Sequence, residues 1–123
     1  MQIKLIEHIS LIIKDINRTE EFYSKLLGEP ILHNENMVVY KIGDTRLFFK
    51  LSPKAVVGAE YDKDNIGMNH IGFGVKTVDE LKQFQQFLSD MGIEHSEIKI
   101  GKFGNEYIWL DDPDGIRLEI YRN

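Results

Sequence analysis

The 123-residue sequence predicts an α+β protein built from two copies of one βαβββ unit. Stretches in which apolar and polar residues alternate, as in half-buried strands, are interrupted twice by a stretch with helical spacing. The order of one strand, one helix and three strands occurs over residues 5–51 and again over residues 69–121. An internal repeat of this kind indicates two similar modules that share a core.

The first predicted strand runs from Leu5 to Ile13. Its apolar residues occupy alternate positions, so His8 and Ser10 lie on the face that does not pack. Three more strands follow the first helix, with Gly43-Asp44 as the hairpin turn between the last two. These strands are Pro30 to His33, Met37 to Ile42 and Thr45 to Leu51.

The helix of the first unit is predicted to end at Leu27, because Gly28 is a typical helix stop. Asp15 or Asn17 can cap its start, since both side chains accept hydrogen bonds from backbone N–H groups. Three apolar residues form the expected buried stripe: Phe22, Leu26 and Leu27.

The alternation lapses between Ser52 and Gly67, where Pro53, Gly58 and a polar run over residues 62–65 predict a linker or a mobile surface loop. We therefore expect a first module over residues 1–52, a linker over residues 53–67 and a second module over residues 68–123. At this length the two modules form one domain.

The second unit begins with a predicted strand from Asn69 to Val75, in which His70, Gly72 and Gly74 lie on the face that does not pack. Thr77 to Glu80 is a capping-box sequence that opens the second helix. Its apolar residues recur at helical spacing before Gly92 ends it: Leu81, Phe84, Leu88 and Met91. Three strands are then expected, around His95 to Ile100, Glu106 to Leu110 and Ile116 to Tyr121.

The last strand follows a predicted turn over residues 111–115. Pro113 suits position i+1 of a type I turn and Gly115 suits position i+3. After the turn, alternation places Glu119 in the middle of the strand on the face that does not pack. A carboxylate in that place can simply be solvated, but the histidines elsewhere in the chain favour a functional role.

The two units align residue by residue. His8-Ile9 corresponds to His70-Ile71, and Arg46-Leu47-Phe48 corresponds to Arg117-Leu118-Glu119 after a modest insertion in the second unit. The alignment shows where function could have broken the symmetry, because Phe48 stands where the second unit has Glu119.

The composition excludes several classes of protein. The chain has no cysteine, so it has neither a disulfide framework nor a thiolate metal site. Its net charge is -5 and its basic residues are scattered among acids, so we expect no nucleic-acid partner. No segment approaches the length of a membrane span and no leader is recognisable, which favours the cytoplasm.

The strand order and two motifs resemble the vicinal oxygen chelate superfamily, whose members include glyoxalase I, extradiol dioxygenases, fosfomycin resistance transferases and bleomycin resistance proteins. The motifs are Asn69-His70-Ile71-Gly72-Phe73-Gly74-Val75 and the closing run Asp112-Pro113-Asp114-Gly115-Ile116-Arg117-Leu118-Glu119-Ile120-Tyr121. The resemblance covers nearly the whole chain apart from the linker. It implies that the strands curl into a mixed sheet around a cleft.

The resemblance also implies a metal site. In such proteins the ligands come from the first and last strand of each module, which points here to His8, His70 and Glu119, with Phe48 at the fourth position. Two imidazoles and one carboxylate suit a divalent ion of Fe, Mn, Ni, Co or Zn and leave positions open for a substrate. His33 and His95 lie on middle strands, outside this set, and we expect them to be surface or hydrogen-bonded residues.

The expected function is that of a metal-dependent enzyme acting on a small molecule that chelates through neighbouring oxygens. Glyoxalase-like lyase or isomerase chemistry and ring-cleaving dioxygenation both fit. Phe48 removes the fourth ligand that glyoxalase I typically has. Dioxygenase and fosfomycin relatives have a tyrosine ten positions before the glutamate, where this chain has Trp109. Tyr107, on the same face, is then the candidate proton donor.

Four residues are candidates for the substrate walls: Tyr107, Trp109, Phe48 and Arg117. The main alternative is a metal-free protein that sequesters a cationic drug, as bleomycin resistance proteins do. That class does not need two histidines and a glutamate. A third possibility is an interaction module without catalysis.

The resemblance finally implies a homodimer, because relatives with two modules usually pair. In several of them a cleft is built from the first module of one chain and the second module of the other. We therefore expect His8 to come from the partner of the chain that supplies His70 and Glu119.

Overall fold

The computed structural model describes residues 1–52, 54 and 58–123. Two compact units make up the chain, Met1–Ala59 and Glu60–Asn123. The boundary between them falls inside the linker expected over residues 53–67, and residues 53 and 55–57 of that linker lie outside the described residues. Within the described residues, neither helix is long and apolar enough to cross a membrane.

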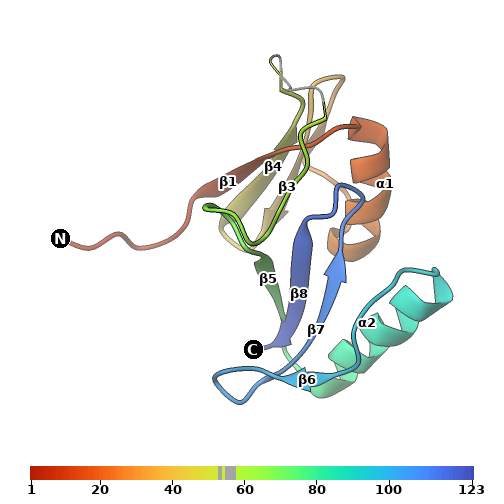
Figure 1. The fold of residues 1–123 in the computed structure, drawn as a ribbon. Coiled ribbons are helices and arrows are strands. Elements are labelled where there is room, and N and C mark those ends of the chain that lie inside the picture. The colour runs from red at the N-terminus through yellow and green to blue at the C-terminus, as the bar shows by residue number, and fades with distance from the viewer. Residues whose placement is uncertain (53, 55–57) are drawn as a thin grey trace. The chain divides into compact units, whose positions relative to one another are not determined.

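The first unit is a four-stranded mixed sheet with one helix (Figure 1). Its elements are β1 (His8–Ile12), α1 (Ile16–Leu27), β2 (Leu32–His33), β3 (Met37–Ile42) and β4 (Thr45–Lys50). The strand order is β1-β4-β3-β2, so the first and last strands of the unit are neighbours. β1 runs parallel to β4, and the other pairs are antiparallel.

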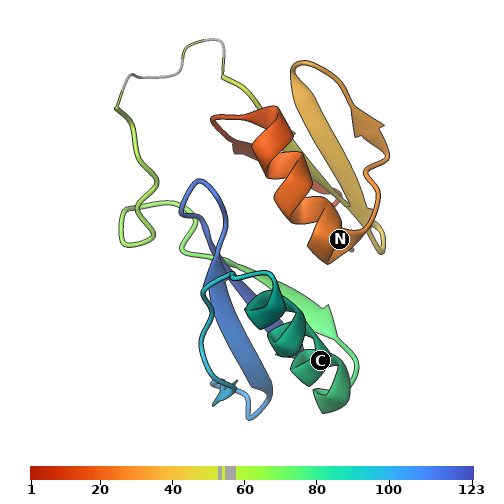
Figure 2. The same cartoon turned by 90° about the vertical axis from the view of Figure 1, so that its right-hand side faces the viewer.

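The second unit repeats this arrangement with the order β5-β8-β7-β6. Its elements are β5 (Ile71–Val75), α2 (Val78–Asp90), β6 (Lys99–Ile100), β7 (Glu106–Asp111) and β8 (Arg117–Arg122). In each unit the helix lies along one face of that unit's own sheet (Figure 2). The predicted α+β class with two βαβββ modules is confirmed, and the two modules form separate, open sheets.

The strand registers agree with the alignment of the two repeats. In the first unit Ser10 of β1 pairs with Phe48 of β4, and in the second unit Gly72 of β5 pairs with Glu119 of β8. Phe48 and Glu119 therefore occupy the same position in their sheets. The face of the first sheet that carries Phe48 is thus equivalent to the face of the second sheet that carries Glu119.

Both helices begin at the caps that the sequence predicts. The Asp15 carboxylate accepts a hydrogen bond from the Arg18 backbone N–H at 2.9 Å, so Asp15 and not Asn17 is the cap of α1. Gly28 ends this helix with a φ of 84°, a conformation that favours glycine. Thr77 caps α2 by accepting from the Glu80 N–H at 3.1 Å.

The buried side of α1 differs from the prediction. Ile16, Thr19 and Tyr23 are its buried residues, whereas the expected stripe residues are only half-buried: Phe22, Leu26 and Leu27. The reason is an aromatic contact that periodicity alone cannot reveal. Tyr23 is fully buried and its ring centroid lies 4.2 Å from that of Phe49 on β4, so the helix is rotated to place Tyr23 over the sheet.

Several predicted strands are shorter than expected: the second spans only Leu32–His33, and the strand expected from Asn69 begins at Ile71, so His70 lies just before it. The first begins at His8, because Leu5 is about half exposed and lies outside the sheet. The strand expected over residues 95–100 is reduced to β6 and an isolated bridge at His95. Between them the Ser96 hydroxyl accepts a hydrogen bond from Trp109 N at 2.9 Å, so a side chain replaces part of the backbone ladder.

Tyr40 is a buried phenol in the core of the first unit that keeps its hydrogen bonds. Tyr40 is 1% exposed, and its hydroxyl lies 2.9 Å from Ser24 Oγ and 3.3 Å from the Glu20 carbonyl oxygen. Burial raises the pKa of Tyr40 because the phenolate would lose its hydration. Tyr40 therefore joins α1 to β3 as a neutral donor and acceptor.

The predicted turn before β8 is confirmed, and it fixes where Glu119 lies. Gly115 N donates to the Asp112 carbonyl oxygen at 2.9 Å, and the buried Asp112 carboxylate accepts from Asp114 N at 2.8 Å and Ile116 N at 2.9 Å. These bonds satisfy the backbone of the turn internally. β8 therefore starts at a defined residue, which sets the register of Glu119.

Candidate metal site

His70 and Glu119 are brought together in the second unit. Glu119 is in the middle of β8, and His70 immediately precedes β5, the parallel strand beside it. His70 Nε2 lies 3.0 Å from Glu119 Oε1, and the side chains are 38% and 15% exposed. The pair is thus accessible from solvent on the histidine side and sheltered on the carboxylate side.

Asn69 determines how the His70 ring is held. The Lys63 carbonyl can only accept a hydrogen bond, and it does so from Asn69 Nδ2 at 2.8 Å. The amide oxygen Oδ1 of Asn69 is therefore the atom that lies 2.7 Å from His70 Nδ1. Since this oxygen can only accept, Nδ1 carries a proton.

This tautomer leaves the lone pair of a neutral His70 on Nε2, facing Glu119. Two electron-rich atoms 3.0 Å apart repel each other unless a cation lies on or between them. A second proton on His70 meets this requirement, and so does a metal ion bound by both side chains. The arrangement of the two side chains is therefore compatible with a shared cation.

The geometry of the pair fits a divalent transition metal. Imidazole nitrogen and carboxylate oxygen bind such ions at about 2.1 Å, so two ligands at right angles on one ion lie about 3.0 Å apart. The observed separation of Nε2 and Oε1 is also 3.0 Å. No group of three or more His, Cys, Asp or Glu side chains that could hold a metal is present among the described residues. The second unit therefore offers two of the three predicted ligands.

The third predicted ligand, His8, opens β1 in the first unit. Its Nδ1 is hydrogen-bonded to Glu7 Oε2, while Glu7 Oε1 accepts from Arg46 Nη2. The hydrogen bond with His8 is the larger of two hydrogen-bond effects that hold the pKa of Glu7 below its usual value, and the hydrogen bond from Arg46 is the other. The His8 side chain is 54% exposed, which leaves its Nε2 available to a ligand.

Phe48 holds in the first unit the register position that Glu119 holds in the second. Its ring meets that of His8 edge-on with centroids 5.4 Å apart, and the Arg46 guanidinium carbon lies 5.7 Å from its centroid. A phenyl ring offers no lone pair to a metal. The pair formed by His8 and Phe48 is therefore an apolar counterpart of the pair formed by His70 and Glu119.

The predicted substrate-wall residues of the second unit lie on the same face as Glu119. Trp109 of β7 pairs directly with Glu119. The Arg117 guanidinium carbon lies 4.2 Å from the Trp109 ring centroid, and Arg117 Nε donates to Asp111 Oδ1 at 2.6 Å. Trp109 is thus the cross-strand neighbour of Glu119 and carries a guanidinium over its ring, an arrangement that can contact a polar, planar group.

The Tyr107 ring stacks on that of Tyr121, with ring centroids 4.7 Å apart and an angle of 12°. Sequence reasoning did not single out Tyr121, although alternation places it on the face of Glu119. Gly101 makes room for it, because a Cβ at that position would lie 2.5 Å from the Tyr121 hydroxyl oxygen. Burial raises the pKa of Tyr121, so it stays a phenol at neutral pH.

A pocket of about 530 Å³ lies beside this stack. Gly72, the register partner of Glu119, belongs to its wall. The full lining consists of Gly72, Phe73, Gly74, Phe103, Asn105, Tyr121, Arg122 and Asn123. Two glycines leave space in the pocket, and aromatic rings make part of its wall apolar. The pocket is therefore suited to a small, partly apolar molecule.

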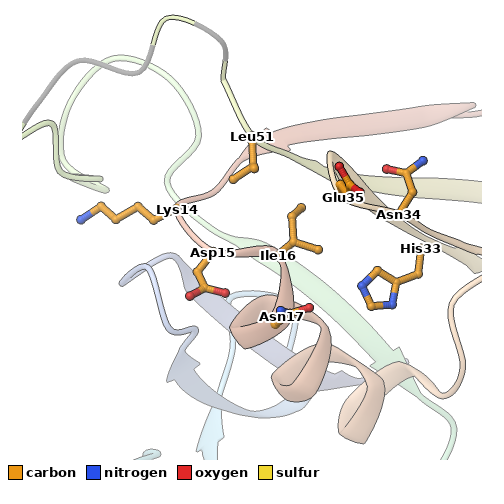
Figure 3. A pocket seen from close by; sticks show the side chains of 8 residues that line it. All are labelled: Lys14, Asp15, Ile16, Asn17, His33, Asn34, Glu35 and Leu51. Atoms are coloured by element: carbon orange, nitrogen blue, oxygen red, sulfur yellow. The ribbon is translucent and has the colours of Figure 1, made fainter.

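The other two histidines behave as predicted. His95 Nδ1 lies 2.8 Å from the Ser96 carbonyl oxygen and its Nε2 lies 2.8 Å from Ser89 Oγ, so both nitrogens are occupied. His33 is exposed on β2. It lines a second pocket of about 620 Å³ around the start of α1, where Lys14, Asp15 and Glu35 mix charges of both signs (Figure 3).

Comparison with known proteins agrees with this fold. The chain is 26% identical over 119 residues to a trivalent organoarsenical cleaving enzyme of Bacillus sp. (strain MD1), covering 93% of this chain and 70% of that protein. A glyoxalase family protein of Enterococcus faecalis is 26% identical with a TM-score of 0.76, covering 97% of this chain and 98% of that one. A lactoylglutathione lyase of Agrobacterium tumefaciens is 20% identical with a TM-score of 0.79, covering 99% and 96%.

A family model matches almost the whole chain. It spans residues 5–120 and describes the Glyoxalase/Bleomycin resistance protein/Dioxygenase superfamily. The match includes both repeats, His8, His70 and Glu119. The chain belongs to the Glyoxalase/Bleomycin resistance protein/Dioxygenase superfamily.

Proposed function

We propose that the protein is a metal-dependent enzyme that acts on a small substrate chelating the ion through neighbouring oxygens. The observation that carries this proposal is the pair of His70 Nε2 and Glu119 Oε1, 3.0 Å apart, in which the Asn69 hydrogen bond makes both facing atoms acceptors. A divalent cation of Fe, Mn, Ni, Co or Zn satisfies both atoms at once.

The roles of the residues follow from their places on the sheet. His70 and Glu119 would hold the ion together with His8, and the bound ion would supply Lewis-acid chemistry. Trp109 and Arg117 would line the substrate site beside Glu119 in the second unit, and Phe48 would line it in the first. Tyr107 would donate a proton, and its stack with Tyr121 limits how far its hydroxyl can move.

The complete site is proposed to form in a homodimer. Members of this superfamily bind small molecules and often dimerise. His8 would then come from one protomer, and His70 and Glu119 from its partner. The second unit brings together two of the three proposed ligands, His70 and Glu119, so the third would come from a first unit.

The substrate of one relative is not expected to suit this chain. The organoarsenical cleaving enzyme takes a trivalent arsenical, and a trivalent arsenic centre is a soft acceptor that favours thiolates. This chain has no cysteine. Its wall of Tyr, Trp and Arg residues favours an oxygen-bearing, planar substrate instead.

Metal analysis of protein purified without chelator or affinity tag tests the proposal. We expect one divalent transition metal per chain. Oxygen uptake in the presence of catechols then separates the two reactions, because ring-cleaving dioxygenation consumes O2 and lyase or isomerase chemistry does not. Protein that takes up no metal, but binds a cationic glycopeptide drug, would contradict the proposal and support a sequestering protein.

A further inference from the structure

Each predicted histidine ligand is hydrogen-bonded at Nδ1 by the side chain of the residue that precedes it. In the first unit Glu7 Oε2 is the partner of His8 Nδ1. In the second unit Asn69 Oδ1 is the partner of His70 Nδ1 at 2.7 Å. The two contacts stand at equivalent positions of the internal repeat.

Both acceptors are themselves held from the other side. Asn69 Nδ2 donates to the Lys63 carbonyl at 2.8 Å, which orients its amide oxygen toward His70. Glu7 accepts from Arg46 Nη2 through its other oxygen, and its carbonyl accepts from Arg46 N at 2.9 Å. Each histidine is therefore the end of a short chain of hydrogen bonds, which fixes the ring more firmly than a single exposed contact does.

We infer that Glu7 and Asn69 are positioning residues that keep the proton on Nδ1 and present Nε2 of each histidine to the metal. This inference rests on the metal site proposed above. Its physical basis is general: a ligating histidine donates its other N–H to a carboxylate or carbonyl, which sets the tautomer and the ring orientation and raises the basicity of the ligating nitrogen.

The two positioning residues, Glu7 and Asn69, differ in charge, so the two histidines are unequal ligands. Glu7 offers a carboxylate whose second oxygen accepts from the Arg46 guanidinium, whereas Asn69 offers a neutral amide oxygen. A negative acceptor draws the Nδ1 proton more strongly than a neutral amide does, and so increases electron donation from Nε2. His8 is therefore the stronger donor and His70 the weaker one.

Substitutions at Glu7 and at Asn69 test this inference on the whole protein. The variants are Glu7→Leu and Asn69→Leu, which remove the acceptor, and Glu7→Gln and Asn69→Asp, which keep it and exchange its charge. Glu35→Leu is the matched control, because it removes an exposed negative charge that lies elsewhere in the first unit. The probe is zinc, titrated into metal-free protein against a chelating indicator.

We expect each leucine variant to bind zinc about 10–100-fold more weakly than the wild type, the usual effect of losing such a partner. Glu7→Gln should lie between the wild type and Glu7→Leu, and Asn69→Asp should bind at least as tightly as the wild type. Glu35→Leu should be unchanged. Leucine variants that bind zinc as tightly as the wild type would overturn the inference, whereas a wild type that binds no metal would overturn the proposed function.

A second readout needs no metal. In 15N-histidine spectra of the metal-free protein at about pH 8.5, two units above the usual histidine pKa of about 6.5, the tautomer of each neutral ring is observable. His8 should carry its proton on Nδ1 in the wild type and in Glu7→Gln, and should lose this preference in Glu7→Leu. An unchanged His8 tautomer in Glu7→Leu would overturn the role of Glu7 even if all variants fold normally.

Discussion

Glu119 Oε1 lies 3.0 Å from His70 Nε2, and it faces the nitrogen that the Asn69 hydrogen bond leaves without a proton in the neutral ring. The contact joins the start of β5 to the middle of β8, residues that are 49 positions apart in the chain. It depends on the parallel pairing of the first and last strands of the module. The same pairing in the first module brings His8 to Phe48.

The first prediction concerns the proposed ligands themselves. His70→Ala or Glu119→Gln should weaken metal binding by more than the roughly 10–100-fold that an outer hydrogen-bond partner contributes. Both side chains lie on the face that does not pack, so the fold should persist. Metal content by elemental analysis and circular dichroism measure the two effects. His33→Ala, at an exposed histidine outside the site, should keep its metal, and equal metal content in all three variants would contradict the assignment.

The second prediction uses the asymmetry of the repeat. Phe48→Glu should place a carboxylate beside His8, as Glu119 lies beside His70, and tighten metal binding by at least about tenfold, since affinity rises with the number of charged ligands. Phe48→Gln is the control, because it has a similar length without the charge. If glutamate and glutamine at this position give the same affinity, the side chain of residue 48 does not face the ion.

The third prediction tests whether a site is shared between protomers. His8→Ala and Glu119→Gln proteins should each bind metal poorly. After subunit exchange, a heterodimer with shared sites has one intact and one doubly altered site, so tight metal binding should return. Exchange is verified with differently tagged chains that are cleaved before metal analysis. Metal binding that stays absent in verified heterodimers would show that each chain builds its own site.

The fourth prediction concerns the core of the first unit. Phe49 is fully buried and lies against Tyr23 and Tyr40. Phe49→Ala should lower the free energy of unfolding by about 3–5 kcal/mol, because it removes a large buried ring and leaves a cavity. Phe103→Ala is the matched control, since Phe103 is 92% exposed and its loss should change stability by less than about 0.5 kcal/mol. Urea unfolding measures both, and similar values would contradict the packing described.

The fifth prediction is a pH dependence of stability. The hydrogen bond from Arg122 Nε lowers the pKa of Glu106 in the folded state below its usual value of 4.5. A lowered folded-state pKa means that this pair stabilises the fold above pH 4.5 and that the contribution is lost as pH falls through the lowered pKa.

Glu106→Gln should therefore be less stable than the wild type at neutral pH, and the difference should shrink toward zero in acid. Arg122→Met should show the same loss, and the double variant should lose no more than either single variant. Additive losses at neutral pH would mean that the two side chains act separately.

The sequence by itself determined the local structure of this protein, meaning its repeat, its helix caps and the turn before its last strand. The structure confirms the internal repeat, which the order of the periodic segments predicted. It also confirms the helix caps at Asp15 and Thr77 and the turn before β8, because these features depend on hydrogen bonds between residues close together in the chain. The period of two also placed Glu119 on the open face of its strand, because neighbouring side chains in a strand must point to opposite sides.

The tertiary structure decided which residues on a face touch each other. Alternation placed Tyr107 and Trp109 together on one face, yet Tyr107 stacks on Tyr121 and Trp109 lies under Arg117. These contacts depend on cross-strand register and side-chain rotamers, which a period cannot specify. The rotation of α1 toward Tyr23 likewise depends on the shape of the sheet beneath it.

The hydrogen bonds from Glu7 and Asn69 to the histidines also needed the folded chain. In an extended strand, residues next to each other point to opposite faces, so sequence alone gives no reason for either side chain to reach the ring that follows it. Both residues precede their strands, where the backbone is free of that alternation. Arg46 and the Lys63 carbonyl then hold them in place, and these partners are known only from the fold.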